Sequence, residues 1–158
     1  METSKIKPPP GFGKEVNKYL NHHVTIADAK AAGILTADLA LGGYISASTH
    51  SSVCIINLQW APLILLFLSG TFALSTLYPR TPKVGSSIIF WEDIRARTTM
   101  EAYLNDLKDV NEAEVERQYG AQNYLISGLL SKKYRFVRLG MWTLMGATPF
   151  VMLKLLLG

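Results

Sequence analysis

The sequence predicts an all-α membrane protein that crosses the bilayer about three times and carries a charged helical domain on the cytoplasmic side. Of its 158 residues, 49% are hydrophobic and 18% are charged, a composition too apolar for a disordered chain. The apolar residues are also unevenly distributed. Between Ala31 and Leu77 the sequence contains one carboxylate, Asp38, and no lysine or arginine, which is typical of membrane segments rather than of a soluble domain.

Residues 1–30 are assigned to a cytoplasmic N-terminal arm and an amphipathic helix. The run of three prolines from Pro8 predicts a flexible, extended arm that ends near Gly13. From Lys14 onward, apolar residues recur at helical spacing and polar residues occupy the remaining circumference. This pattern predicts a helix that leads toward the first span.

Residues 31–78 are predicted to form a transmembrane hairpin, with spans over about 31–48 and 57–78. The first span has about the minimum length for crossing a bilayer and is rich in small residues, which allow close helix packing. The second is longer and uncharged. Trp60 and Tyr78 lie near its ends, where aromatic side chains meet lipid headgroups.

Lysine and arginine residues flank this hairpin on both sides, whereas the short link between its spans contains neither. Positively charged residues next to membrane helices stay preferentially in the cytoplasm. The N-terminus and the region that follows the second span are therefore predicted to be cytoplasmic.

Residues 79–138 are expected to form a cytoplasmic helical domain. We interpret residues 85–91, which end in four apolar side chains, as a loop on the membrane surface rather than a short strand. Thr98 is followed three residues later by a glutamate, which is capping-box spacing and predicts a helix over residues 99–110. Asn111 has a glutamate at the same spacing and predicts the start of the next helix.

Residues 139–158 are predicted to form a third membrane helix. No strong helix breaker precedes Pro149, so one long helix is expected to leave the cytoplasmic domain and enter the bilayer directly. Pro149 and Lys154 leave two alternatives. The segment either crosses fully, with Lys154 reaching outward, or forms a shallow C-terminal anchor.

The sequence offers no candidate for catalysis, and we expect no enzyme. It contains no HExxH, GxSxG, Walker or dinucleotide-binding motif. The single Cys54 cannot form an intramolecular disulfide or a four-ligand zinc site. His22 and His23 have no cysteine or carboxylate at the i+4 ligand spacing. We therefore predict no metal site and no organic cofactor.

Asp38 is the strongest anomaly in the predicted first span. A carboxylate at the centre of a membrane helix costs about 2.5 to 3.5 kcal/mol, so a partner or a water-lined position is expected. One alternative is a pore-lining or gating group. The other is a carboxyl bonded to Thr36, Ser46 or a neighbouring subunit.

Charged residues also mark both ends of the hairpin. Asp28 and Lys30 precede the first span, and Arg80 and Lys83 follow the second. Because a hairpin brings its two ends together, these groups are expected at the same membrane level. They are either ordinary cytoplasmic flanking charges, as we interpret Lys83, or part of a ligand site or a structural ion pair, an alternative that stays open for Arg80.

A basic stripe precedes the third span. Successive helical turns place Lys132, Arg135 and Arg138 on one side, with Tyr134 and Phe136 nearby. This cluster either contacts anionic lipids or binds a phosphate group, in which case the aromatic rings are available to stack on a base.

Several different short motifs follow one another along the chain. They are Asp28-Ala-Lys30-Ala at the first span, Tyr78-Pro79-Arg80 after the second, Ile89-Phe90-Trp91 with Asp93-Ile94, Glu101-Ala-Tyr103-Leu104, and Lys133-Tyr134-x-x-Val137-Arg138. In this order and spacing they resemble the Pycsar membrane-effector family, and the resemblance covers most of the chain after the N-terminal arm. Asp38 departs from the family pattern, in which a neutral polar residue is expected.

The resemblance implies a bacterial antiphage defence effector, a multi-pass protein of the inner membrane paired with a pyrimidine nucleotide cyclase. Its activating ligand would be cyclic CMP or cyclic UMP. Binding would convert the protein into a state that impairs the membrane and stops growth. A homo-oligomer in the lipid bilayer is expected, because three thin helices enclose little space; no DNA or RNA partner is expected.

The position of the nucleotide site is inferred from the chain's own residues and is not matched to the family pattern. The cyclic phosphate is expected to meet Lys30 or Arg80, and the base is expected to stack near Phe90, Trp91 or Tyr134. The full candidate set is Asp28, Lys30, Arg80, Phe90, Trp91, Tyr134, Arg135 and Arg138.

Two other functions remain open on the sequence alone. One is a constitutive membrane adaptor that docks a soluble partner on a helix face formed by Met100, Tyr103, Leu104 and Leu107. The other is a small, nucleotide-independent pore of the holin kind. Growth arrest without any cyclase would favour the pore.

Overall fold

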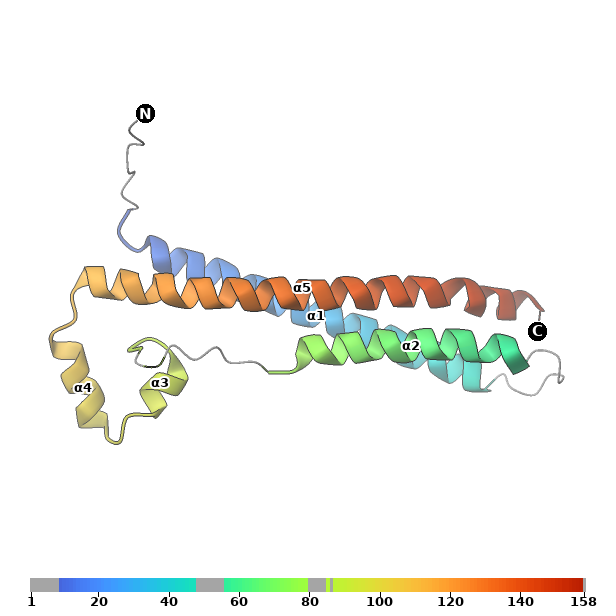
Figure 1. The fold of residues 1–158 in the computed structure, drawn as a ribbon, viewed down its shortest axis with the longest axis horizontal. Coiled ribbons are helices and arrows are strands. Elements are labelled where there is room, and N and C mark those ends of the chain that lie inside the picture. Colours follow the sequence, from blue (N-terminus) through green and yellow to red (C-terminus); the bar gives the residue numbers. More distant parts are fainter. Residues whose placement is uncertain (1–8, 48–55, 80–84, 86, 158) are drawn as a thin grey trace, which may run out of the picture. The chain divides into compact units, whose positions relative to one another are not determined.

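The structure, a computed structural model, describes residues 9–47, 56–79, 85 and 87–157, and within these residues it contains helices and no strand (Figure 1). The helices are α1 (Phe12–Ala47), α2 (Ile56–Leu77), α3 (Trp91–Arg95), α4 (Met100–Lys108) and α5 (Glu112–Leu157). The predicted all-α class is therefore confirmed.

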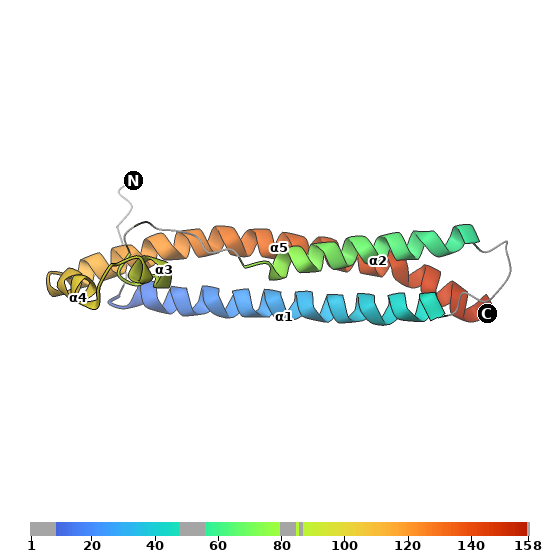
Figure 2. The same cartoon turned by 90° about the horizontal axis from the view of Figure 1, so that it is seen from below.

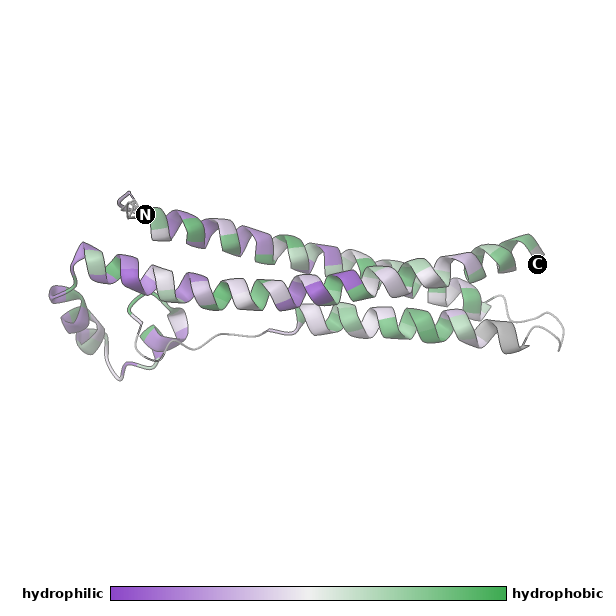
Figure 3. Cartoon of the chain, turned by 45° about the horizontal axis from the view of Figure 1, so that its top comes forward, coloured by the Kyte–Doolittle hydropathy of each residue, from purple (hydrophilic) through white to green (hydrophobic). Residues whose placement is uncertain are grey.

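Among the described residues, two helices are long and apolar enough to cross a membrane, α2 over Trp60–Leu77 and α5 within Glu112–Leu153. Figure 3 shows hydrophobic residues dominating α2 and the C-terminal part of α5. The second predicted span corresponds to α2, and the third lies in α5. The first predicted span, residues 31–48, lies in α1 as far as Ala47, and α1 is not one of these two helices.

The chain divides into two compact units. We call residues 24–79 and 130–158 the membrane bundle, and residues 1–23 and 80–129 the charged unit. In the membrane bundle, the C-terminal part of α1, the whole of α2 and the C-terminal part of α5 lie side by side (Figures 1 and 2). Both α1 and α5 contribute residues to both units.

The membrane bundle buries one stripe of each helix. The buried positions recur at intervals of three, four or seven residues, as expected for helices that pack along a common seam. They are Ala27, Ala31, Ile34, Asp38 and Ile45 in α1, Pro62, Leu66, Ser69, Ala73 and Thr76 in α2, and Lys133, Val137, Gly140, Ala147 and Val151 in α5. Many of these residues are small, which lets the backbones approach closely in a membrane.

In the charged unit, the start of α1 lies against the start of α5. The backbone amide of Gly13 donates to Glu116 Oε2 (2.9 Å), and Asn123 donates to the carbonyl of Gly13 (2.8 Å). Asn17 donates to Asn123 in turn (2.9 Å). The flexible arm predicted up to Gly13 is thus wrong at its end, because α1 already begins at Phe12; residues 1–8 lie outside the described residues.

The short helices follow the predicted cues with small shifts. The loop interpretation holds for residues 87–90 but is wrong at Trp91, which begins α3. The helix predicted over residues 99–110 is α4, and its N-cap is Thr99 rather than Thr98, since the Thr99 hydroxyl accepts from the amide of Ala102 (3.1 Å).

The start of α5 confirms the second predicted cap. The side chain of Asn111 accepts from the amide of Glu114 (2.9 Å), which satisfies one of the free N–H groups of the first turn. From there α5 runs unbroken through Pro149 to Leu157, as the absence of an earlier helix breaker predicts.

Candidate functional site

A buried lysine joins the three helices of the membrane bundle. Lys133, on α5, is 7% exposed and donates to the carbonyl oxygen of Thr76 (2.8 Å) and to the carboxylate of Asp28 on α1. Thr76 lies in the last turn of α2, whose carbonyl groups have no partner within the helix. Lys133 therefore caps the negative end of α2, which has no basic residue in its own last turn.

Lys30 and Tyr134 meet beside this lysine. The Lys30 ammonium nitrogen lies 5.5 Å from the centroid of the Tyr134 ring, within the range of a cation–π contact. Lys30 follows Asp28 by two residues in α1, and Tyr134 adjoins Lys133 in α5. The structure thus brings three of the predicted ligand residues, Asp28, Lys30 and Tyr134, into one place.

The remaining basic candidates are placed differently. Arg135 and Arg138 are both exposed on α5, and within the described part of the chain neither forms an ion pair with an acidic residue. Arg80 lies outside the described residues. Lys83 does too, so the predicted meeting of Asp28 and Lys30 with Arg80 and Lys83 is described only on its α1 side.

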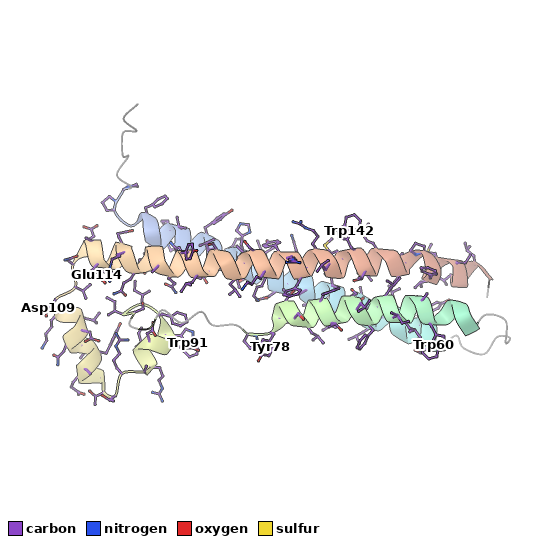
Figure 4. The ribbon with its side chains drawn as sticks, in the orientation of Figure 1. Trp60, Tyr78, Trp91, Asp109, Glu114 and Trp142 are labelled. Atoms are coloured by element: carbon purple, nitrogen blue, oxygen red, sulfur yellow. The ribbon has the colours of Figure 1, made fainter. Side chains whose placement is uncertain are left out.

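The aromatic pair Phe90 and Trp91 belongs to the charged unit. Phe90 is 7% exposed and Trp91 is 61% exposed, and their ring centroids are 6.1 Å apart. Trp91 projects from the start of α3 and is labelled in Figure 4. Phe90 thus serves the packing of this unit, whereas the face of Trp91 is available to a ligand.

Hydrogen bonds fix the loop that carries this aromatic pair. Gln118 of α5 accepts from the amide of Ile88 (2.8 Å), and Tyr103 of α4 donates to the carbonyl of Ile88 (3.1 Å). Asp93, which is buried, accepts from the amide of Ser87 (3.1 Å). The loop is therefore tied to α3, α4 and α5 at once.

Asp38, the predicted pore or gating candidate, lies on the buried stripe of α1 and is 7% exposed. Neither of its carboxylate oxygens has a hydrogen-bond partner among the described residues. Thr36 and Ser46, the partners considered from the sequence, donate to carbonyl groups of their own helix, at 3.0 and 2.9 Å. The bonds expected from these two hydroxyls to Asp38 are therefore not formed.

The described residues contain no group of histidine, cysteine and carboxylate side chains arranged to hold a metal ion. His22 and His23 instead make ring contacts, His23 with Tyr19 at a centroid distance of 4.4 Å. The chemistry that the membrane bundle presents is an ammonium group over an aromatic ring, next to a buried ion pair. Such a set suits recognition of an anionic, planar ligand.

Lys133 is the residue that the sequence analysis left out of the candidate set. Its spacing contains the necessary signal, because it stands seven residues after the buried Ile126 and four before the buried Val137. A lysine on the apolar stripe of a helix needs an acidic or carbonyl partner. The other basic residues of the cluster, Lys132, Arg135 and Arg138, are exposed, and from the sequence Lys133 was treated as one of them.

Comparison with known proteins identifies the family. A family model described as the Pycsar effector protein domain, PycTM, matches residues 12–158. The chain is also 30% identical over 129 residues to the Pycsar effector protein SaPycTM of Staphylococcus aureus, which covers 76% of this chain and 77% of that protein. No solved structure matches the chain.

Proposed function

The chain belongs to the Pycsar effector family, and from this premise we propose that it senses cyclic CMP or cyclic UMP and then impairs the bacterial inner membrane until growth stops. Membership gives the coarser role, a membrane effector of antiphage defence that works with a cyclase. The observation that carries the proposal is the family match, which spans both the charged unit and the membrane bundle.

The contact between Lys30 and Tyr134 supports a nucleotide site at this end of the membrane bundle. The ammonium group of Lys30 suits a cyclic phosphate, and the ring of Tyr134 suits a base that stacks on it. Lys133 is already bonded to Asp28 and to the end of α2, so its charge holds the site together. Arg80 is proposed as a further phosphate ligand because it belongs to the Tyr78-Pro79-Arg80 motif at the end of the second span.

Ligand binding must favour one state of the protein if it is to activate it, because equal affinity for two states shifts neither. Lys30 lies in α1 and Tyr134 lies in α5. A nucleotide that separates the ammonium group from the ring would therefore change the packing of these two helices in the membrane bundle.

We further propose the topology that the sequence predicts, with an N-terminal two-span hairpin, a cytoplasmic charged unit and a third C-terminal span, except that this third span begins before Arg138 rather than at residue 139, because Gly140 bonds to Ser69 near the middle of α2. The basic residues on both flanks of the hairpin support the orientation. We propose a homo-oligomer and a non-enzymatic mode of action, since a bundle of three helices is too thin to enclose a water-filled path.

The direct test is equilibrium binding of labelled cyclic CMP and cyclic UMP to the full chain in detergent, with cyclic AMP and cyclic GMP as competitors. Lys30→Ala and Arg80→Ala should each weaken binding about tenfold, which corresponds to the loss of one charge-assisted hydrogen bond. Lys14→Ala is the matched control, because it removes the same charge from an exposed position of the charged unit.

The binding measurements distinguish a nucleotide site at Lys30 from a chain that binds no nucleotide. Binding of one pyrimidine nucleotide that is weakened by Lys30→Ala and unchanged by Lys14→Ala supports the site. Absence of binding in a folded sample would refute nucleotide sensing by this chain.

One observation favours the adaptor as a second candidate. On α4, the side chains of Met100, Leu104 and Leu107 share a face and are 69%, 47% and 38% exposed. This apolar face is suited to a soluble partner. Replacing Leu104 with lysine should abolish growth arrest if the adaptor function is correct, and should leave nucleotide binding unchanged.

A further inference from the structure

Asp38 lacks the partners that a buried carboxylate needs. Three hydroxyl groups lie on the adjoining turns of α1 and α2, and each donates to a backbone carbonyl. Thr36 and Thr71 donate within their own helices, at 3.0 and 2.8 Å, and Ser69 donates to the carbonyl of Gly140 on α5, at 3.0 Å. The nearby hydroxyl protons are therefore already used, and Asp38 remains an acceptor without a donor among the described residues.

Asp38 lines an apolar groove between α1 and α2. The groove has a volume of about 310 Å³, and all of its lining residues come from these two helices of the membrane bundle. Gly42 and Gly70 contribute no side chains to it, whereas Leu39 and Phe67 are 70% and 75% exposed. The groove is thus open on the outer surface of the bundle and has room for a large side chain.

The depth of this groove follows from α2. Trp60 and Tyr78 are 62% and 66% exposed near the two ends of α2, where aromatic residues meet lipid headgroups. Ser69 stands midway between them and bonds to Gly140 of α5. Asp38 adjoins this level, because one of its carboxylate oxygens lies 3.6 Å from the position of a Cβ on Gly70. The carboxylate therefore lies near the middle of the span.

Two donors on α5 flank the same level. Arg138 and Trp142 lie on either side of Gly140, each within about 3 Å of it along the helix axis. They are four residues apart and share one face. Arg138 is exposed and Trp142 is 64% exposed. Figure 4 shows Trp142 on the side of α5 that faces away from α2.

We propose that the α1–α2 groove of one copy receives the Arg138–Trp142 face of α5 from a second copy, and that Arg138 pairs there with Asp38. The proposal deepens the oligomer of the proposed function by naming the two surfaces that meet. Within the described part of one copy, the carboxylate of Asp38 has no donor, and Arg138 and Trp142, for which no acceptor is described, lie at the same depth. The indole N–H of Trp142 adds a second donor beside the guanidinium.

Lipid alone satisfies neither group. A carboxylate and a guanidinium are each costly in hydrocarbon, and both costs fall when the two groups pair. The groove and the α5 face are different surfaces of the same bundle, so the contact is heterologous. Such a contact repeats from copy to copy and closes into a ring when the rotation permits.

Cysteine cross-linking tests the contact in membranes. In a Cys54→Ser background, one tagged copy carries Leu39→Cys at the rim of the groove, and a second copy carries Met145→Cys on the proposed α5 face. Both positions are exposed, at 70% and 59%. Cross-links between the two copies should exceed those formed with a Met152→Cys copy about tenfold, because Met152 lies about two turns further along α5.

Cross-links of the Leu39→Cys copy with itself at equal yield would overturn the heterologous contact, and so would no cross-link between different copies. The second test exchanges charges. Asp38→Arg and Arg138→Asp should each abolish assembly alone, and their co-expression should restore it, because the two variants complement each other only when Asp38 of one copy pairs with Arg138 of another. If either charged variant fails to reach the membrane, Asp38→Asn and Arg138→Gln replace them, and each should weaken assembly at least about threefold.

Arg135→Gln is the control, since it removes an exposed arginine of the same helix one turn away. Failure of the contact and failure of nucleotide sensing give different results. Loss of cross-linking with intact nucleotide binding overturns only the contact. Intact cross-linking without nucleotide binding overturns only the sensing role.

Discussion

The membrane bundle and the charged unit hold their helices together by different means. In the membrane bundle, apolar stripes provide most of the contact, and the polar bonds between helices converge on Lys133 and Ser69. In the charged unit, polar bonds between elements are spread over the start of α1, the loop before α3, and the helices α4 and α5.

This difference has a physical origin. A membrane offers no water to a polar group that loses its partner, so a bond in the membrane bundle has no ready substitute. In the charged unit water replaces a lost partner at an exposed position, and each bond contributes less. A single substitution should therefore cost more in the membrane bundle than in the charged unit.

The largest effect is expected from Lys133→Ala. It leaves the carboxylate of Asp28 and the last-turn carbonyl of Thr76 without their shared donor. Because the Asp28 side chain is 37% exposed, we expect a loss of about 3 kcal/mol in unfolding free energy, the lower end for breaking a buried pair. Thermal or denaturant unfolding in detergent measures it.

The neighbouring Lys132→Ala is the matched control, because Lys132 is exposed. It should change stability by less than about 0.5 kcal/mol. Replacing Asp28 and Lys133 together with leucine should regain much of the loss, since no uncompensated charge remains. Equal losses for Lys132→Ala and Lys133→Ala would contradict the structural role of this lysine.

The second effect concerns the close approach of α1 and α5 in the charged unit. A Cβ on Gly13 would lie 2.6 Å from Glu116 Oε2 and 2.8 Å from the Cβ of Tyr119. Gly13→Ala must therefore push the two helices apart and weaken the bonds at Gly13, at a cost of about 2 kcal/mol. Hydrogen exchange should rise at residues 12–17 of α1. The Gly128→Ala control, at a position with open space, should leave exchange there unchanged.

The elements were largely predictable from sequence because local rules set them. Hydrophobic length predicts α2, and the side-chain cap at Asn111 predicts the start of α5. The capping-box spacing did not identify the correct N-cap of α4, because Thr98 and Thr99 are adjacent and offer the same side-chain hydroxyl one residue apart. The helix α3 was not predicted, because a helix of about one turn is too short to show hydrophobic periodicity.

The site was less predictable, because it depends on pairing across helices. Asp28, Lys30 and Tyr134 were anticipated from motifs, yet their common place follows only from the packing of α1 against α5. Lys133 was not included because a lysine among several basic residues is normally expected to be exposed. Its burial follows only from its place on the buried stripe of α5. Hydrophobic periodicity read through the charged residues would have found it.

The N-cap of α4 gives a smaller effect. Thr99→Ala removes the acceptor for the amide of Ala102, which typically costs about 1 kcal/mol. Because α4 buries none of its residues, the change should be confined to this helix. Faster amide exchange in residues 100–103, with an unchanged melting temperature of the membrane bundle, is the expected result. Thr98→Ala should do less, and a larger effect at Thr98 would move the cap by one residue.

The smallest effect is a titration. Glu15 bonds to Lys18 (2.8 Å), and this hydrogen bond and the charge of Lys18 hold the pKa of Glu15 below its ordinary value. A folded-state pKa below the unfolded value gives stabilisation that is present above the unfolded pKa and is lost as pH falls through the folded pKa. Both side chains are exposed, so the contribution to stability is small and the pKa itself is the better readout.

An NMR titration of the Glu15 carboxyl should therefore show a midpoint below that of an ordinary glutamate. In Lys18→Gln the midpoint should rise toward the ordinary value, and high salt should raise it in the same direction. Lys14→Gln should move the midpoint less, because Lys14 lowers the pKa of Glu15 only through its charge and more weakly than Lys18 does. A midpoint that is the same in the wild type and in Lys18→Gln would show that this exposed pair does not persist in solution. Exposed pairs contribute little to stability in water, in contrast to the buried pair that Lys133 forms in the membrane bundle.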